Sequence, residues 1–210
     1  MPKHIMDISR WQGRIDWDVV QRSGTIDGVM LRVLGSKGGK PYLDPTFEAN
    51  YATCIKRGIL VGGYSYTCAQ TRQQVEDELA TLKAILTGKT FQLPVAVDVE
   101  DPKLKVLTPK ELSALVRLYA AEIERWGLYV MVYTYTNFAD TALDMDALAA
   151  YDLWIADYRG KRPTRKHGMW QYTNKGSVPG VKNCVDLSHA YKDYAAIIAK
   201  KGLDRLREGA

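Results

Sequence analysis

The chain has 210 residues, of which 46% are hydrophobic and 25% are charged. These fractions are close to the averages of globular proteins, and they exclude a disordered chain and a small disulfide-dependent fold. Lys and Arg number 29 and Asp and Glu number 24, so the formal net charge is +5. An excess this small does not indicate a nucleic-acid-binding protein, but it is compatible with the approach to an anionic polymer.

Length and composition predict one domain over residues 1–210, with its core over about residues 4–202. The start of the chain, MPKHIMDIS, has no apolar segment after its charged residue, so we expect no signal peptide. No apolar run approaches the roughly 18 residues that a membrane span needs. We therefore expect a monomer that is made in the cytoplasm, inserts into no membrane and reaches any target outside the cell by another route.

Cysteine and histidine are rare and scattered: Cys54, Cys68, Cys184, His4, His167 and His189. An odd number of cysteines favours free thiols over a disulfide framework, although a bridge between Cys54 and Cys68 fits their positions on a helix and after the next strand. No CxxC spacing occurs and the histidines are far apart in the chain, so the sequence predicts no metal site. We also expect no cofactor, because neither a dinucleotide fingerprint nor a P-loop is present.

Short apolar runs alternate with amphipathic helices along the chain. The runs that we expect as strands are His4–Ser9, Gly28–Leu34, Ile59–Tyr66, Leu93–Glu100, Leu128–Tyr135, Asp152–Tyr158, His167–Tyr172 and a short piece near Cys184–Leu187. Apolar residues at spacings of three and four predict helices that begin at the caps Asp44, Thr71 and Thr108. A last helix is expected over Ser188–Lys201.

This order of elements predicts a parallel sheet that is either open or closed into a barrel. Eight strands in 210 residues would make a small (β/α) barrel in which some helices are shortened. The repeat breaks down after Tyr158, where strand-like pieces follow one another without a helix. The expected fold class is therefore α/β, TIM-barrel-like, with about eight strands and fewer than eight helices.

Acidic residues stand at the ends of several predicted strands: Asp7, Asp98, Glu100, Asp157 and Asp186. The functional groups of α/β barrels collect at the carboxyl ends of the strands. Asp98 and Glu100 follow the apolar run LPVAV, and residues two apart on a strand point to the same side, about 6.6–7 Å apart. Two carboxylates placed in this way repel each other's charge, so that one keeps its proton to a higher pH, as a general acid must.

The other acids are less distinctive. Asp101 precedes Pro102, which is typical of a turn or a helix cap. For Asp7 and Asp186, spacing alone favours a turn as much as a catalytic role. The pair of Asp98 and Glu100 is therefore the strongest indication of chemistry, although a D-x-E at a strand end is only moderately specific.

Further motifs lie in a fixed order along the chain: Asp7-Ile8-Ser9, Gln12-Gly13, Ile15-Asp16-Trp17, Asp27-Gly28, Tyr42-Leu43-Asp44-Pro45, Gly62-Gly63-Tyr64-Ser65-Tyr66, Val97-Asp98-Val99-Glu100, Val132-Tyr133-Thr134-Tyr135, Leu153-Trp154-Ile155-Ala156-Asp157-Tyr158, Trp170-Gln171-Tyr172 and Val185-Asp186. With these motifs the chain resembles glycoside hydrolase family 25, the Chalaropsis-type lysozymes or N-acetylmuramidases, which include many phage endolysins. The resemblance runs from about Met6 to Tyr191, nearly the whole chain. No single motif carries it; the order and the spacing do.

The resemblance implies an irregular, flattened α/β barrel whose acidic groove at the strand ends binds bacterial peptidoglycan. Members of the family hydrolyse the β-1,4 bond between N-acetylmuramic acid and N-acetylglucosamine. Carried over by position, Glu100 resembles the general acid and Asp98 its partner carboxylate, while Asp7 and Asp186 resemble the other two acids of the cluster. The expected function is thus peptidoglycan hydrolysis, and the expected partner is the cell wall rather than nucleic acid.

Neighbouring positions on one strand suit a substrate-assisted reaction better than a pair of carboxylates that flank the bond. In this hypothesis Glu100 protonates the glycosidic oxygen, the 2-acetamido oxygen attacks the anomeric carbon, and Asp98 stabilises the oxazolinium. Glu100 then activates water, and the configuration is retained. The rival is Asp98 or Asp186 as nucleophile or as base for water, with inversion in the latter case. The alternatives in function are a non-catalytic peptidoglycan- or chitin-binding barrel and a chitin-cleaving barrel glycosidase.

Aromatic residues at strand ends are expected to stack on sugar rings. The candidates for substrate binding are Tyr66, Tyr133 and Trp154, followed by Tyr42, Tyr64, Tyr158 and Gln171. Arg32 stands where many relatives carry lysine, and we expect it to pair with a substrate carboxylate or with the acid cluster. Asp157 either adds negative charge to the groove or points outward.

Overall fold

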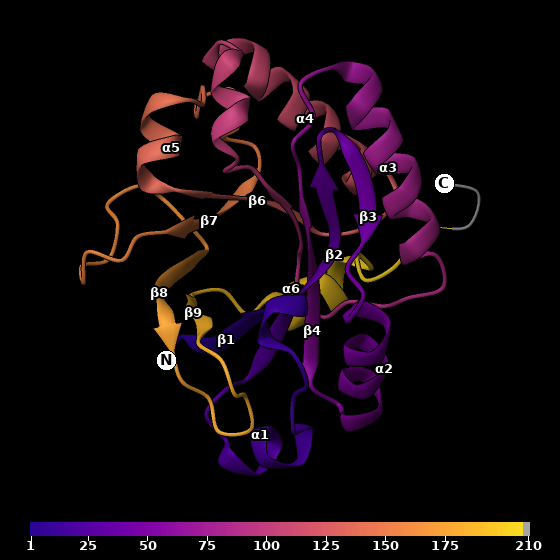
Figure 1. The fold of residues 1–210 in the computed structure, drawn as a ribbon, viewed down its shortest axis with the longest axis vertical. Helices are drawn as coiled ribbons and strands as arrows, with labels where there is room; N and C mark the ends of the chain where they lie inside the picture. The colour runs from indigo at the N-terminus through magenta and orange to yellow at the C-terminus, as the bar shows by residue number, and fades with distance from the viewer. Residues whose placement is uncertain (208–210) are drawn as a thin grey trace.

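The computed structural model describes residues 1–207, which contain nine β-strands and six α-helices (Figure 1). The strands are β1 Lys3–Ile8, β2 Gly28–Lys37, β3 Lys40–Leu43, β4 Leu60–Tyr66, β5 Val95–Asp98, β6 Val130–Tyr135, β7 Asp152–Ala156, β8 Met169–Gly176 and β9 Val185–Ala190. The helices are α1 Trp17–Ser23, α2 Phe47–Arg57, α3 Arg72–Leu86, α4 Pro109–Arg125, α5 Thr136–Thr141 and α6 Tyr194–Lys201, with short 3-10 helices η1 Arg10–Gln12 and η2 Pro102–Val106.

Eight of the strands close into a barrel. The sheet runs in the order β1-β9-β8-β7-β6-β5-β4-β2-β3, and β1 also pairs with β2, so that the ring is complete. β3 lies outside the ring as the second arm of a hairpin, antiparallel to β2. The α/β barrel with about eight strands and fewer than eight helices is confirmed, whereas the β2–β3 hairpin was not expected.

The barrel is mixed rather than fully parallel. β9 runs antiparallel to both of its neighbours, β1 and β8. The helix expected over Ser188–Lys201 is wrong in its first part, because β9 continues to Ala190 and α6 begins only at Tyr194, after the side-chain cap of Asp193. Without a helix between β8 and β9 the chain simply reverses, and strands joined in this way pair antiparallel.

Helices cover only part of the barrel's outer surface. α2, α3, α4 and α5 pack on strands between β2 and β6, where their apolar stripes form the larger hydrophobic core. A second cluster fills the interior of the barrel and includes Ile5, Met30, Ala96, Met131 and Trp154. The interior is therefore a packed core rather than a pore, so any ligand site has to lie at an end of the barrel or on its outer surface.

The cysteines and the helices answer two expectations about the whole chain. Cys54 and Cys68 are buried, Cys184 is exposed, and all three are free thiols. The bridge between Cys54 and Cys68 is therefore not formed. Among residues 1–207, no helix combines the length and the apolar character that crossing a membrane requires.

Candidate active site

Four acidic side chains meet at one end of the barrel. Asp7 lies near the end of β1, Asp98 is the last residue of β5, and Glu100 follows two residues later. Asp186 is the second residue of β9, not the end of a strand as the sequence indicated. Because β9 is reversed, its beginning lies at the carboxyl end of the parallel strands, where Asp186 is the register partner of Asp7. We call these four residues the acid cluster.

Burial and mutual repulsion favour the protonated forms of the acid cluster. Asp7 and Asp98 are 5% and 4% exposed, and Glu100 and Asp186 are partly exposed. Loss of hydration raises the pKa of all four carboxyls above the ordinary range. The charge of Asp186 raises the pKa of Asp7 further, and the charge of Glu100 raises that of Asp98. The four groups do not all ionise at neutral pH.

Glu100 has the proton that is best placed for chemistry near neutrality. Burial and the charges of Asp186 and Asp101 raise the pKa of Glu100 to about 7. Glu100 also reaches a cavity of about 510 Å³. The other lining residues include Tyr133, Tyr135, Asn137, Tyr158 and Arg159. A carboxyl that is protonated at this pH and opens onto a cavity can act as a general acid toward a bound leaving group.

Asp98 holds a buried oxygen without a partner. Its Oδ1 makes no hydrogen bond within the part of the chain that the structure describes. Burial and the charges of Glu100 and Asp7 raise the pKa of this carboxyl, and Arg32 offsets only part of that rise. Leaving a buried polar atom unpaired is costly, so such an atom is a candidate to bind a donor group of a ligand.

Gln171 links the acid cluster to two tyrosines. It is 1% exposed, and its Nε2 donates to Asp7 Oδ2 at 3.0 Å. Its Oε1 accepts hydrogen bonds from the hydroxyls of Tyr133, at 2.9 Å, and Tyr158, at 2.5 Å. Gln171 was predicted to bind substrate. Because it is buried, we infer that it instead positions Asp7 and the hydroxyls of Tyr133 and Tyr158 through these hydrogen bonds.

The predicted sugar-stacking residues differ in accessibility. Trp154 is 1% exposed, donates from Nε1 to Ser188 Oγ at 3.0 Å, and packs edge-to-face on Tyr133 with 4.6 Å between ring centroids. Trp154 lies inside the barrel and presents no ring face to a ligand. We infer that it positions the ring of Tyr133, against which it packs. The remaining aromatic candidates are at least partly exposed: Tyr42, Tyr64, Tyr66 and Tyr158.

The chain matches the model of one protein family, glycosyl hydrolases family 25, over residues 6–181. It belongs to this family. The predicted family and the predicted class of enzyme, a lysozyme-type glycoside hydrolase, are thereby confirmed.

Several relatives are similar to the hydrolase over most of its length, and two of them are named lysozymes. "Uncharacterized protein YegX" of Escherichia coli strain K12 is 30% identical over 192 residues, which cover 88% of this chain and 68% of the relative. "Autolytic lysozyme" of Clostridium acetobutylicum is 29% identical over 184 residues, which cover 87% of this chain and 54% of the relative. "Lysozyme M1" of Streptomyces globisporus is 26% identical, with coverages of 92% and 69%.

Solved structures share the fold. The spore cortex lytic enzyme SleM of Clostridium perfringens has a TM-score of 0.82 and 24% identity, covering 90% of this chain and 67% of SleM. The autolysin LytC of Streptococcus pneumoniae, solved with a synthetic peptidoglycan ligand, has a TM-score of 0.78 and 25% identity, covering 90% of this chain. The hydrolase spans only 46% of LytC, which is a modular protein.

Arg32 of the hydrolase is held by Asp44, a residue that the sequence predicted only as a helix cap. The Nε and Nη2 atoms of Arg32 lie 2.7 and 2.6 Å from Asp44 Oδ2. Asp44 is 0% exposed and also accepts from the amides of Arg10 and Thr46. The Arg32 side chain, 11% exposed, is thereby fixed beside Asp98. Only the packing of β2 against the loop after β3 brings this pair together.

Replacing Asp44 with alanine is expected to lower the free energy of unfolding by about 3–5 kcal/mol, because it leaves the Arg32 cation buried without its partner. Urea unfolding followed by circular dichroism measures this change. Asp18→Ala is the matched control, since Asp18 is 66% exposed in its pair with Arg57, and we expect a cost of about 1 kcal/mol or less there. Equal costs for the two variants would contradict the buried ion pair.

Asp157 is held by residues outside the acid cluster. Hydrogen bonds from Arg159 and Thr136 hold its carboxylate, with 2.9 Å from Arg159 Nε and 2.8 Å from Thr136 Oγ1. The Arg159 bonds in particular lower the pKa of Asp157 to about 2. The sequence left open whether Asp157 adds negative charge to the groove or points outward, and neither holds in full. Asp157 is 5% exposed, lines the cavity beside Glu100, and its charge is paired with Arg159.

Trp11 and Arg10 are candidate binding residues near the acid cluster that sequence reasoning missed. Both belong to η1, directly after β1 and its Asp7, and Trp11 is 65% exposed. The Arg10 guanidinium lies between two rings, 4.9 Å from the centroid of Trp11 and 5.6 Å from that of Tyr42. The signal in the sequence was a large aromatic residue shortly after an acid at a strand end. A side chain in such a loop does not pack in the apolar core, so an aromatic residue there indicates a binding surface.

Asp101 accepts hydrogen bonds from three donors. The Tyr66 hydroxyl and the Cys68 thiol each donate to Asp101 Oδ2 at 3.0 Å, and the Lys103 amide donates to Oδ1 at 2.8 Å. Burial alone would raise the pKa of Asp101, but the bonds from Cys68 and the other donors outweigh it and lower the value. Asp101 is therefore a fixed negative charge next to Glu100.

Asp101→Asn is expected to move the falling limb of the pH–activity profile to lower pH. Removing a negative charge beside Glu100 lowers the pKa of that acid, so Glu100 loses its active, protonated form earlier as the pH rises. The measurement is kcat/KM between pH 4 and 9, with Asp101→Glu as the variant that retains the charge. A limb that does not move, or that moves to higher pH, would contradict this electrostatic role.

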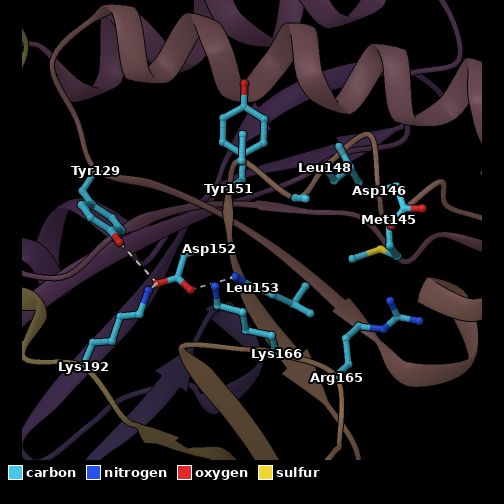
Figure 2. A pocket seen from close by; sticks show the side chains of 12 residues that line it. Tyr129, Met145, Asp146, Leu148, Tyr151, Asp152, Leu153, Arg165, Lys166 and Lys192 are labelled. Atoms are coloured by element: carbon cyan, nitrogen blue, oxygen red, sulfur yellow. Dashed lines mark hydrogen bonds and ion pairs between the residues drawn. The ribbon is translucent and has the colours of Figure 1, made fainter.

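A second cavity lies at the opposite end of the barrel (Figure 2). It holds about 480 Å³, and its lining includes Tyr129, Tyr151, Asp152, Arg165, Lys166 and Lys192. Asp152 is the first residue of β7, so this cavity faces the amino ends of the parallel strands. Its carboxylate already accepts from Lys192, Tyr194 and Tyr129 at 2.8, 2.7 and 3.3 Å. Because Asp152 already has hydrogen-bond partners, this cavity differs from the acid cluster, in which Asp98 has an oxygen without a partner among residues 1–207.

Proposed function

We propose that this hydrolase is a lysozyme that cleaves the β-1,4 bond between N-acetylmuramic acid and N-acetylglucosamine in peptidoglycan. Two relatives are named lysozymes, and LytC of the same fold was solved with a peptidoglycan ligand. The observation that carries the proposal is Glu100: a partly buried carboxyl, protonated up to about pH 7, at the edge of a cavity and within a cluster of acids.

In the first step Glu100 gives its proton to the glycosidic oxygen. As that bond breaks, the carbonyl oxygen of the 2-acetamido group bonds to the anomeric carbon and forms an oxazolinium. The acetamido N–H then donates to the free Oδ1 of Asp98, which has no partner in the described chain. A hydrogen bond to the ionised form lowers the pKa of Asp98, so binding itself favours the charged carboxylate that stabilises the positive ring.

In the second step water opens the oxazolinium. Glu100, now ionised, takes a proton from the water, whose oxygen bonds to the anomeric carbon while the acetamido group is restored. Two displacements at one carbon retain its configuration. Asp7 and Asp186 keep Glu100 and Asp98 in a negatively charged, partly desolvated setting that also attracts the developing cation.

Aromatic residues supply the binding part of the proposal. Tyr64 and Tyr66 are partly exposed and Tyr158 is exposed, and the Arg10 guanidinium lies against the partly exposed ring of Tyr42. Trp154 and Gln171 contribute from below, by fixing Tyr133. Arg32 forms an ion pair with Asp44, and its positive charge lowers the pKa of Asp98.

Mass spectrometry of fragments released from purified peptidoglycan tests the proposal. We expect new reducing ends on muramic acid from the native chain and none from Glu100→Gln. Reducing ends on N-acetylglucosamine, or free amines, would show that another bond is cut. Binding without release by the native chain would favour a non-catalytic wall-binding barrel, and NMR detection of an inverted anomer would favour Asp98 or Asp186 as base for water.

A further inference from the structure

One wall of the barrel has no helix over it. The helices α2 to α5 pack on strands between β2 and β6. In Figure 1 they form the upper and right-hand sides of the molecule, whereas β8 and β9 lie at the lower left edge. The outer face of β8, β9 and the start of β1 is therefore a sheet surface outside the layer formed by these helices.

This open face carries a continuous row of rings. His4, His189 and Trp170 are register partners across β1, β9 and β8. The rings of His4 and His189 lie 5.0 Å apart, and those of Trp170 and His189 lie 5.9 Å apart. Tyr172 stacks on His189 at 4.4 Å with an angle of 17° between the planes. These side chains make one connected surface rather than separate exposed groups.

The row continues past the end of β9. The ring of Tyr191 lies 6.3 Å from His189 and 5.5 Å from His167. The Arg162 guanidinium lies 3.7 Å from the centroid of Tyr191. All three histidines of the chain, which the sequence shows far apart, are thus gathered here. We name the set His4, His167, Trp170, Tyr172, His189 and Tyr191 the ring wall.

The side chains of the ring wall point outward, as their neighbours show. Gln171 and Ser188 turn into the barrel, where they bond to Asp7 and Trp154. Since successive side chains of a strand alternate between its faces, Trp170, Tyr172 and His189 have to face outside. His4 is exposed and the other five members are partly exposed. A contiguous aromatic surface of this kind on a protein marks a place of interaction.

We propose that the ring wall is a second, non-catalytic binding surface for the glycan strand of the polymeric substrate. The inference rests on the proposed function, because it takes the same polymer as the occupant. Flat rings with polar edges match sugars, which have apolar faces and hydroxyl rims. Arg162 and the net charge of +5 complement the carboxylates of muramic acid and its peptides.

The ring wall is also continuous with the active site. The Trp170 indole donates to the carbonyl oxygen of Asp157 at 2.9 Å, and Asp157 and Tyr158 line the cavity beside Glu100. A glycan strand that leaves the groove over Tyr158 therefore comes directly onto Trp170 and Tyr172. Two linked contacts with one polymer raise the effective concentration of the groove on an insoluble wall, without a change in the chemistry.

Pelleting with purified cell walls tests the ring wall. The walls are stripped of teichoic acid, and every protein carries Glu100→Gln so that bound glycan is not cut. Tyr172→Ala with Tyr191→Ala is expected to raise the apparent Kd for these walls about tenfold. Tyr151→Ala, at the other end of the barrel, is the matched control and should bind normally. In the active background, the double variant should cut a short soluble peptidoglycan fragment at the native rate.

If the double variant fails to fold, His4→Glu tests the same surface, because His4 is exposed and the change adds a negative charge that repels the carboxylates of the polymer. It too should weaken pelleting while soluble turnover is kept. Unchanged pelleting of the folded variants overturns the proposal, and so does a loss seen only on walls that retain teichoic acid, which would assign the surface to a phosphate polymer. Failure of the proposed function shows separately, as an absence of muramic reducing ends from the native chain.

Discussion

Glu100→Gln is expected to lower kcat about 10²–10⁴-fold, the usual contribution of a general acid. The amide has nearly the same shape as the carboxyl but no proton to give, so the leaving oxygen departs unprotonated. Turnover of a soluble peptidoglycan fragment measures the change. Glu124→Gln is the control, because Glu124 is exposed on the last part of α4. A loss of less than about tenfold would mean that another group supplies the proton.

The same variant is expected to be more stable than the native chain at alkaline pH. The pKa of Glu100 is about 7 in the folded protein, against an ordinary value of 4.5. The folded state therefore holds this proton more tightly than the unfolded state, and stability is lost as the pH rises from about 4.5 to 7. Above that window the native chain lacks about 1–3 kcal/mol that the glutamine variant keeps.

Urea unfolding at pH 4.5 and at pH 8 measures this gain in stability. The difference between Glu100→Gln and the native chain should grow in favour of the variant at the higher pH. Gain of stability with loss of activity is the signature of a group whose environment serves chemistry rather than folding. A difference that stays constant between the two pH values would contradict the raised pKa of Glu100.

Asp98→Asn is expected to lower kcat about 10²–10³-fold with little change in KM. The asparagine amide fills the same space but brings no negative charge to the oxazolinium, so the loss falls on the transition state. The native chain should lose a comparable factor on N-deacetylated glycan, which cannot form that ring. Asp98→Asn should then add little on the deacetylated substrate, because both changes remove the same interaction.

Equal rates of the native chain on acetylated and N-deacetylated glycan would sink the substrate-assisted route. A protein nucleophile would then be required, and a 2-fluoro glycoside should trap a covalent ester on Asp98 or Asp186. Asp77→Asn is a suitable control for aspartate replacement, because Asp77 lies exposed on α3, far along the chain from the acids.

Much of this protein follows from local sequence. Runs of apolar residues that alternate with amphipathic helices indicate an α/β barrel, since each periodicity commits a segment to one kind of element. The strand expected to end at Glu100 predicts Asp98 and Glu100 on a common side, whereas β5 ends at Asp98 and Glu100 follows it in the loop. Glu100 and Asp98 were therefore accessible to sequence reasoning before any fold was known.

Other features required the folded chain. Asp186 joins the acids only because β9 is reversed, and a reversed strand puts its first residues where the other strands have their last. Trp154 resembled a sugar platform, but its strand turns it into the barrel. Arg32 forms an ion pair with Asp44, although the sequence predicted that it pairs with a substrate carboxylate or with the acid cluster. The three histidines, far apart in the sequence, lie together in the ring wall.

The division has a physical reason. The period of a strand or helix decides from local interactions which residues of one element share a face. The partner that each residue meets there depends on strand order, strand direction and the closure of the ring. These are set by the burial of the whole core, to which distant segments contribute together. Sequence thus determined the class of fold and indicated Asp98 and Glu100 as the proposed catalytic pair, and tertiary structure alone decided which residues surround that pair.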